Sequence, residues 1–122
     1  MEKHLDVMKR TVELAATCLE GIEHIKIRVN QGYFEDTIQL LQDFVLAFYQ
    51  MEKSIQPIVN ELPPNQLDEF TTLLRDAIDL VVSAYEKGEG GKALEIIQFN
   101  LLPSYKKWQS ELERCLNPFI LS

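Results

Sequence analysis

The sequence of 122 residues has few of the side chains that build metal centres and disulfide frameworks, with two cysteines and two histidines. No Cys-x-x-Cys pair is present, and Cys18 lies far from Cys115 in the chain. This spacing excludes the common zinc modules and the disulfide-rich secreted folds. Both cysteines fall on apolar helical positions, which predicts buried free thiols. We therefore expect no metal and no cofactor.

Positive charge is also scarce, because 12 Lys and Arg stand against 19 Asp and Glu, for a net charge of −7. Nucleic acids and anionic membranes are bound by clustered Lys and Arg, which this chain does not offer. No stretch reaches the ~18 uncharged apolar residues of a membrane span, and the N-terminus lacks the apolar run of a secretory signal. We expect a cytoplasmic protein that binds neither nucleic acid nor a membrane.

Alternating polar and apolar residues, which mark β-strands, are missing, so no sheet is expected. Apolar residues instead recur at steps of three and four, the spacing of amphipathic helices. Breaks fall at Gly32, at the Leu-Pro-Pro-Asn of residues 62–65, and at the glycine-rich residues 88–91. The predicted helices cover residues 3–30, 34–60, 65–87 and 92–116. They predict one domain over residues 1–122, an all-α, up-down-up-down four-helix bundle.

Three prolines and one asparagine give sharper local predictions. Asn65 is expected to cap the third helix, and Pro57 to kink or end the second. Pro103 lies inside the fourth helix, where it removes the hydrogen bond to the carbonyl of Phe99 and should bend the helix. Pro118 should stop that helix, leaving an apolar tail that folds back over the bundle or engages a partner.

A shift of 56 residues aligns parts of the chain with each other. The identical pairs are Glu13 with Glu69, Ile22 with Ile78, Gly32 with Gly88, Gln42 with Gln98, Leu46 with Leu102, Tyr49 with Tyr105 and Ser54 with Ser110. The pattern predicts two similar hairpins, over about residues 3–60 and 65–117. Either a hairpin was duplicated, or two hairpins look alike because both follow a heptad, and the sequence leaves both open.

Chemistry-bearing motifs are weak. His24 follows Glu20 and Glu23, but the inward Glu-x-x-His pattern of metal-binding bundles would need a glutamate where Gly21 stands. The glycine-rich residues 88–91 follow a helix rather than a strand and lack the Lys-Ser/Thr ending of a phosphate loop. No Ser-His-Asp arrangement is present. We expect no enzyme, and the alternative function is a His-phosphotransfer or metal-binding bundle centred on His24.

Apolar surface exceeds what one stripe per helix requires. On the second and fourth helices, apolar residues extend beyond the main stripe or lie opposite to it, at about 100° per residue. These residues are Leu40, Phe44, Met51, Ile96, Phe99 and Pro103. Such a helix is either broadly buried in the core or covered by a partner. The partner interpretation predicts that these six residues bind a second copy or an amphipathic segment of another protein.

The tract from Ala93 to Trp108 reads Ala-Leu-Glu-Ile-Ile-Gln-Phe-Asn-Leu-Leu-Pro-Ser-Tyr-Lys-Lys-Trp. It resembles a tract in small uncharacterised helical proteins of Gram-positive bacteria, where an apolar run precedes a proline and then a tryptophan. The matching residues are Leu101, Leu102, Pro103 and Trp108. The outline is also similar to the flagellar secretion chaperones, acidic bundles that bind a partner's helix. The resemblance implies a bacterial, non-catalytic domain. Together with the surplus apolar surface, it leads us to expect an interaction protein, an adaptor or chaperone-like bundle.

Overall fold

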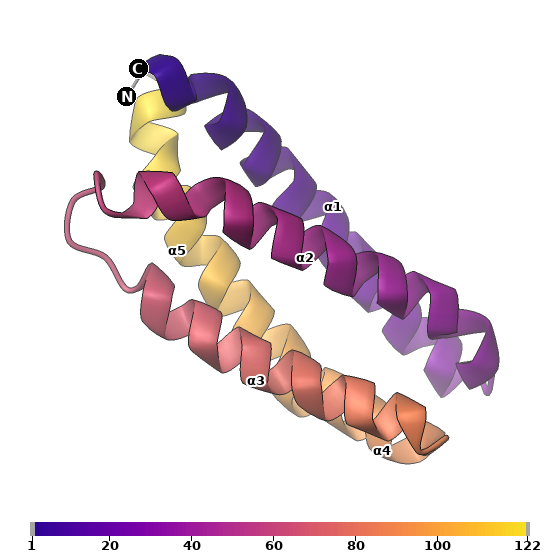
Figure 1. The fold of residues 1–122 in the computed structure, drawn as a ribbon. Helices are drawn as coiled ribbons and strands as arrows, with labels where there is room; N and C mark the ends of the chain where they lie inside the picture. The colour runs from indigo at the N-terminus through magenta and orange to yellow at the C-terminus, as the bar shows by residue number, and fades with distance from the viewer. Residues whose placement is uncertain (1, 122) are drawn as a thin grey trace.

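The computed structural model describes residues 2–121, and these residues contain no strand. There are four long helical segments, and each runs antiparallel to the one before it in the chain (Figure 1). Both ends of the chain therefore lie at the same end of the bundle. The segments are α1 (Leu5–Asn30), α2 (Ile38–Val59), α3 (Leu67–Glu86), and α4 (Gly90–Ile96) continued through the π-helical turn η3 (Ile97–Leu101) into α5 (Leu102–Ile120). Short 3₁₀ turns, η1 (Glu2–His4) and η2 (Phe34–Thr37), precede α1 and α2. The predicted all-α bundle is confirmed.

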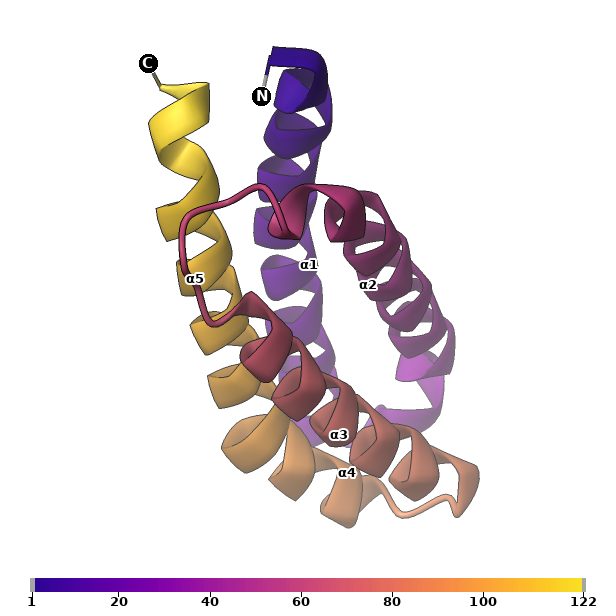
Figure 2. The same ribbon diagram turned by 60° about the vertical axis from the view of Figure 1, so that its left-hand side comes forward.

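The four sides of the bundle are not equally closed. α1 packs along both α2 and α5, and α3 packs along α4 and α5, whereas α2 and α3 touch over a much smaller part of their lengths. Figure 2 shows α2 and α3 on the near side of the bundle, with the connection between them crossing in front of α1 and α5. The bundle therefore has three closed sides and one loosely packed side.

An aromatic cluster in the core holds the four segments together. Trp108 and Tyr105 of α5 lie with ring centroids 5.5 Å apart, and Phe48 of α2 packs edge-on against Trp108 at 5.4 Å. Trp108 Nε1 donates a hydrogen bond to Thr71 Oγ1 of α3 at 3.1 Å, and Tyr105 Oη donates to the carbonyl oxygen of Ala15 of α1 at 2.6 Å. The two buried side chains of α5 therefore pack their rings in the core and also find a hydrogen-bond acceptor for their N–H or O–H group.

The first helix of each hairpin, α1 and α3, ends in the same way. Gly32 and Gly88 have φ of +94° and +69°, the left-handed region that favours glycine. After Gly32, the N–H of Tyr33 donates to the carbonyl of Arg28 at 2.9 Å, and after Gly88 the next N–H donates to the carbonyl of Ala84 at 2.9 Å. Both turns have the Schellman pattern, so the left-handed cap predicted at Gly32 is confirmed.

The start of α3 differs slightly from the prediction for Asn65. The helix begins two residues later, at Leu67, whose N–H donates to Asn65 Oδ1 at 3.0 Å. The N–H of Gln66 donates to the carboxylate of Glu111 on α5 at 2.7 Å. Arg114 holds the same carboxylate through two hydrogen bonds, of 2.7 and 2.8 Å. A side chain from another helix therefore shares the capping with Asn65.

The prolines act differently from the predictions at two places. The predicted single helix over residues 92–116 is divided by the turn η3, which ends at Leu101 and contains Phe99, whose carbonyl the missing N–H of Pro103 leaves without its α-helical hydrogen bond. The expected stop at Pro118 is wrong, because α5 continues to Ile120. A proline this close to a helix end removes one hydrogen bond, and the half-buried Phe119 and Ile120 pack against the core in return. The apolar tail that was expected to fold back over the bundle or engage a partner is therefore the last turn of α5 followed by the exposed Leu121, and Ser122 lies outside the described residues.

Candidate functional site

Three of the six residues predicted to form a partner-binding surface lie in the core. Phe44, Met51 and Ile96 are 5%, 2% and 7% exposed, and the ring of Phe44 packs edge-on against Tyr105 at 5.7 Å. Their predicted place on an outer face is therefore wrong. For Phe44 and Met51, the reason is that α2 packs against α1 and the aromatic cluster at once, so it buries a wider arc than one heptad stripe. Ile96 ends α4, which contacts both α3 and α1.

The other three predicted residues are exposed but do not form one surface. Phe99, in the π-helical turn, is 72% exposed, and together with Pro103 it lines a hollow between α1 and α5. Lys26 and Lys106 border the same hollow. Leu40 lies on α2 and does not line it. Binding of a partner at these residues stays a prediction, without the continuous six-residue surface that was expected.

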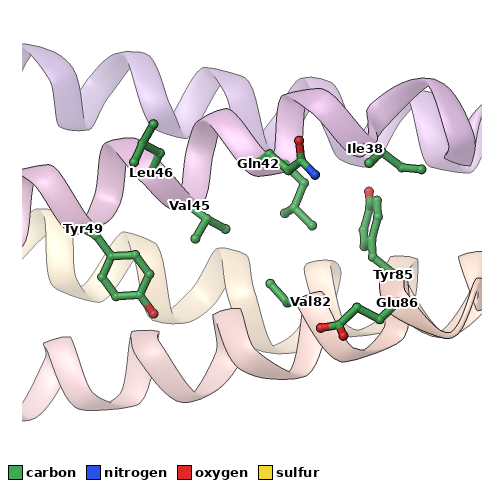
Figure 3. A pocket seen from close by; sticks show the side chains of 9 residues that line it. Ile38, Gln42, Val45, Leu46, Tyr49, Val82, Tyr85 and Glu86 are labelled. Atoms are coloured by element: carbon green, nitrogen blue, oxygen red, sulfur yellow. The ribbon is translucent and has the colours of Figure 1, made fainter.

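The loosely packed side of the bundle contains an apolar groove of about 430 Å³ between α2 and α3. Its walls are Ile38, Leu41, Gln42, Val45, Leu46 and Tyr49 of α2, and Val82, Tyr85 and Glu86 of α3. Figure 3 shows the side chains of Val45, Tyr49 and Tyr85 extending into the space between the two helices. Gln42 and Glu86 are the polar residues among these walls, so the groove offers mainly carbon atoms to an incoming molecule.

The sequence places these side chains on facing sides of two helices. Along α2, Ile38, Val45 and Tyr49 follow each other at helical spacing, so they lie on one face about 16 Å long. Val82 and Glu86, one turn apart on α3, face them. Leu46, which also lines the groove, is 61% exposed.

Polar contacts close the two ends of the groove. At one end, the hydroxyls of Tyr85 and Thr37 form a 2.7 Å hydrogen bond, and the ring of Phe34 packs on Tyr85 at 4.5 Å. Burial raises the pKa of Tyr85, against a smaller opposite effect of its hydrogen bond to Thr37, so the hydroxyl stays neutral. At the other end, an ion pair between Glu52 and Arg75 joins α2 to α3. These contacts hold the helices at a fixed separation and leave the apolar stretch between them open.

The groove corresponds, through the 56-residue repeat, to a closed interface in the other half of the protein. Leu46 and Leu102 are aligned by the repeat, as are Tyr49 and Tyr105. Leu102 is 6% exposed and Tyr105 is fully buried against α1, whereas their counterparts face the groove. The sequence analysis did not identify the groove, although the repeat was the signal that could have found it.

His24 lies on the exposed surface of α1, as do Glu20 and Glu23. Within residues 2–121, no three His, Cys, Asp or Glu side chains gather where they could hold a metal ion.

Cys18 and Cys115 are buried and form no disulfide, as predicted. Burial raises the pKa of both thiols. Among the helices of residues 2–121, none combines the length and the hydropathy that a membrane span requires.

The described residues thus form an all-α protein, a four-helix bundle with one side open along α2 and α3. The chain belongs to the family described as Domain of unknown function (DUF8042), whose family model matches residues 6–111. This match confirms the expected membership of an uncharacterised family. No curated protein and no solved structure matches the chain.

Proposed function

We propose that this chain is a non-catalytic interaction protein that holds an amphipathic helical segment of another protein in the groove between α2 and α3. The observation that carries the proposal is the exposure of Leu46 and Tyr49 at positions whose repeat counterparts are buried. Apolar area removed from water stabilises association by ~25 cal/mol per Å² before entropic costs. A helix in the groove would cover these side chains much as α1 covers Tyr105.

The length of the groove suits a helix. Its apolar length of about 16 Å corresponds to about three helical turns. Helices that bind in grooves do so through apolar residues at positions i, i+3 or i+4 and i+7. Tyr49 and Gln42 offer a hydroxyl and an amide at the α2 wall, which can bind polar atoms at the edge of such a helix.

We further propose that the protein acts in the cytoplasm of a bacterium. The buried thiols of Cys18 and Cys115, neither in a disulfide, support a reducing compartment. The bacterial origin rests on the resemblance of the tract that ends at Trp108.

Methyl NMR on the full chain tests the binding function. Synthetic amphipathic helical peptides of about 18 residues are titrated into protein labelled at valine methyl groups, since shorter helices are marginal in water. We expect the signals of Val45 and Val82, which line the groove, to shift on titration. Val12, on α1, lies outside the groove and serves as the matched control.

Two results would contradict the proposal. One is that no amphipathic peptide shifts Val45 or Val82. The other is that Val12 shifts as much as the two groove valines, which would indicate general adhesion to apolar surface.

A further inference from the structure

The net charge of the chain is confined to the half that forms the groove. Residues 34–87, which comprise η2, α2, α3 and their connection, contain ten acidic and three basic residues. Residues 1–33 contain five of each sign, and residues 88–122 contain four of each. The two helices that wall the groove therefore belong to a segment with a charge of −7, while the rest of the chain is neutral.

Two of these charges lie beside the groove. Glu86 lines it, and Asp79, exposed and one heptad earlier on α3, lies on the same side of that helix. Of the three basic residues in the segment, Arg75 is paired with Glu52. The other two are Lys53 and Lys87, and from outside the segment Arg28 pairs with Asp36 and His4 with Glu61. Among the described residues, Asp79 and Glu86 have no ion-pair partner. The apolar groove is therefore bordered by unbalanced negative charge.

We infer that the occupant of this groove is a basic amphipathic helix, with an apolar stripe that enters between α2 and α3 and with Lys or Arg side chains flanking that stripe. The inference rests on the proposed function and adds the charge of the partner. Opposite charges around an apolar contact speed association and select partners. A cationic helix satisfies both the carbon-lined walls and the acidic edge.

The same charge argues against a second copy of this chain as the occupant. Face-to-face association through the grooves would bring two segments of charge −7 together. Like charges set against each other oppose such a contact, most strongly at low ionic strength. A dimer through this face is therefore an outcome that would overturn the inference.

Three fluorescently labelled helical peptides of one design test the inference of a basic partner. They share an identical leucine stripe and differ only at the flanking positions, which are all Lys, all Gln or all Glu. Fluorescence anisotropy with the full chain gives the three dissociation constants. At about 10 mM salt, we expect the Lys peptide to bind at least tenfold more tightly than the Gln peptide, and the Glu peptide most weakly. The preference should shrink to about twofold near 1 M salt, where the Debye length is about 3 Å.

A pair of double variants locates the effect. Asp79→Lys with Glu86→Lys reverses two charges at the groove, and Glu13→Lys with Glu20→Lys reverses two exposed charges one heptad apart on α1. Both change the net charge by the same amount. We expect the first to weaken binding of the Lys peptide about tenfold at low salt and the second less than threefold. Circular dichroism verifies that both remain folded.

The outcomes separate the inference from the function on which it rests. If all three peptides bind equally and shift Val45 and Val82, the groove binds helices but the inference of a basic partner is wrong. The inference is also overturned if the two double variants weaken binding equally, or if sedimentation shows self-association that Leu46→Gln abolishes. If no peptide binds, the proposed function itself fails.

Discussion

Tyr49 and Tyr105 stand 56 residues apart at matching positions of the two hairpins, but only Tyr105 is buried. The hydroxyl of Tyr105 donates a 2.6 Å hydrogen bond to the carbonyl of Ala15, whereas Tyr49 is 39% exposed in the groove. Burial raises the pKa of Tyr105 far above its ordinary value, so the hydroxyl remains a donor across the pH range in which proteins are folded. One hairpin uses its tyrosine in the core, whereas the matching tyrosine of the other hairpin lines the groove.

This difference predicts that the same substitution destabilises the protein at one position and not at the other. Tyr105→Phe should lower the free energy of unfolding by about 1 kcal/mol, because it removes one buried hydrogen bond. Tyr49→Phe should leave it within about 0.5 kcal/mol of wild type, as expected for surface positions. Urea unfolding followed by circular dichroism measures both. Equal losses in the two variants would contradict the assignment.

Phe44 and Phe99 make a second matched pair. Phe44→Ala should cost about 3 kcal/mol or more, because truncating a buried ring leaves a cavity in the aromatic cluster. Phe99 is largely exposed, so Phe99→Ala should change the free energy of unfolding by less than about 0.5 kcal/mol. Thermal unfolding distinguishes them, and a stable Phe44→Ala variant would show that this side chain does not belong to the core.

Two glycines should respond to alanine in opposite directions. Gly32→Ala should destabilise the protein by about 1–2 kcal/mol, since a Cβ is unfavourable at a positive φ. Gly21 lies inside α1 with no atom within 4 Å of an added Cβ, so Gly21→Ala should stabilise by about 0.5–1 kcal/mol. Chemical denaturation of both variants checks the signs, and a stabilised Gly32→Ala would rule out the left-handed cap.

The carboxylate of Glu111 should make stability depend on pH. The hydrogen bonds from Arg114 lower its pKa below the ordinary value of 4.5, more than burial raises it. A carboxylate whose pKa is depressed on folding stabilises the protein above its unfolded pKa and loses this contribution as pH falls through its folded pKa. We therefore expect wild type to lose stability below about pH 4.5 more steeply than Glu111→Gln. Urea titrations at several pH values test this, and parallel curves would contradict it.

The helices and their ends could largely be predicted from the sequence because their signals are local. Gly32 and the Leu-Pro-Pro-Asn break at residues 62–65 act through their own backbone preferences, and the structure follows them. The prediction for Pro118 was wrong because the helix end is stabilised by the packing of Phe119 and Ile120 on the core. Such tertiary contacts cannot be read from the local sequence.

The burial of Phe44, Met51 and Ile96 could not be predicted from helical angles alone. The width of the buried arc depends on how many neighbours a helix has, and α2 is flanked by α1 and the aromatic cluster. The groove escaped prediction for a related reason. Leu46 and Leu102 are both leucines at matching positions of the repeat, but they differ in exposure, because α2 and α3 touch over a much smaller part of their lengths than α1 and α5.

The most direct test of the groove compares two exposed leucines. Leu46 lines the groove, and Leu80, 50% exposed, lies on the opposite side of α3 from Val82. Leu46→Gln and Leu80→Gln remove similar apolar surface and leave the net charge unchanged. The measurement is the dissociation constant of the Lys-flanked amphipathic peptide for each folded variant. We predict that Leu46→Gln weakens binding about tenfold, as loss of one buried leucine contact implies, and that Leu80→Gln changes it less than twofold. Equal dissociation constants for the two variants would contradict a binding site between α2 and α3.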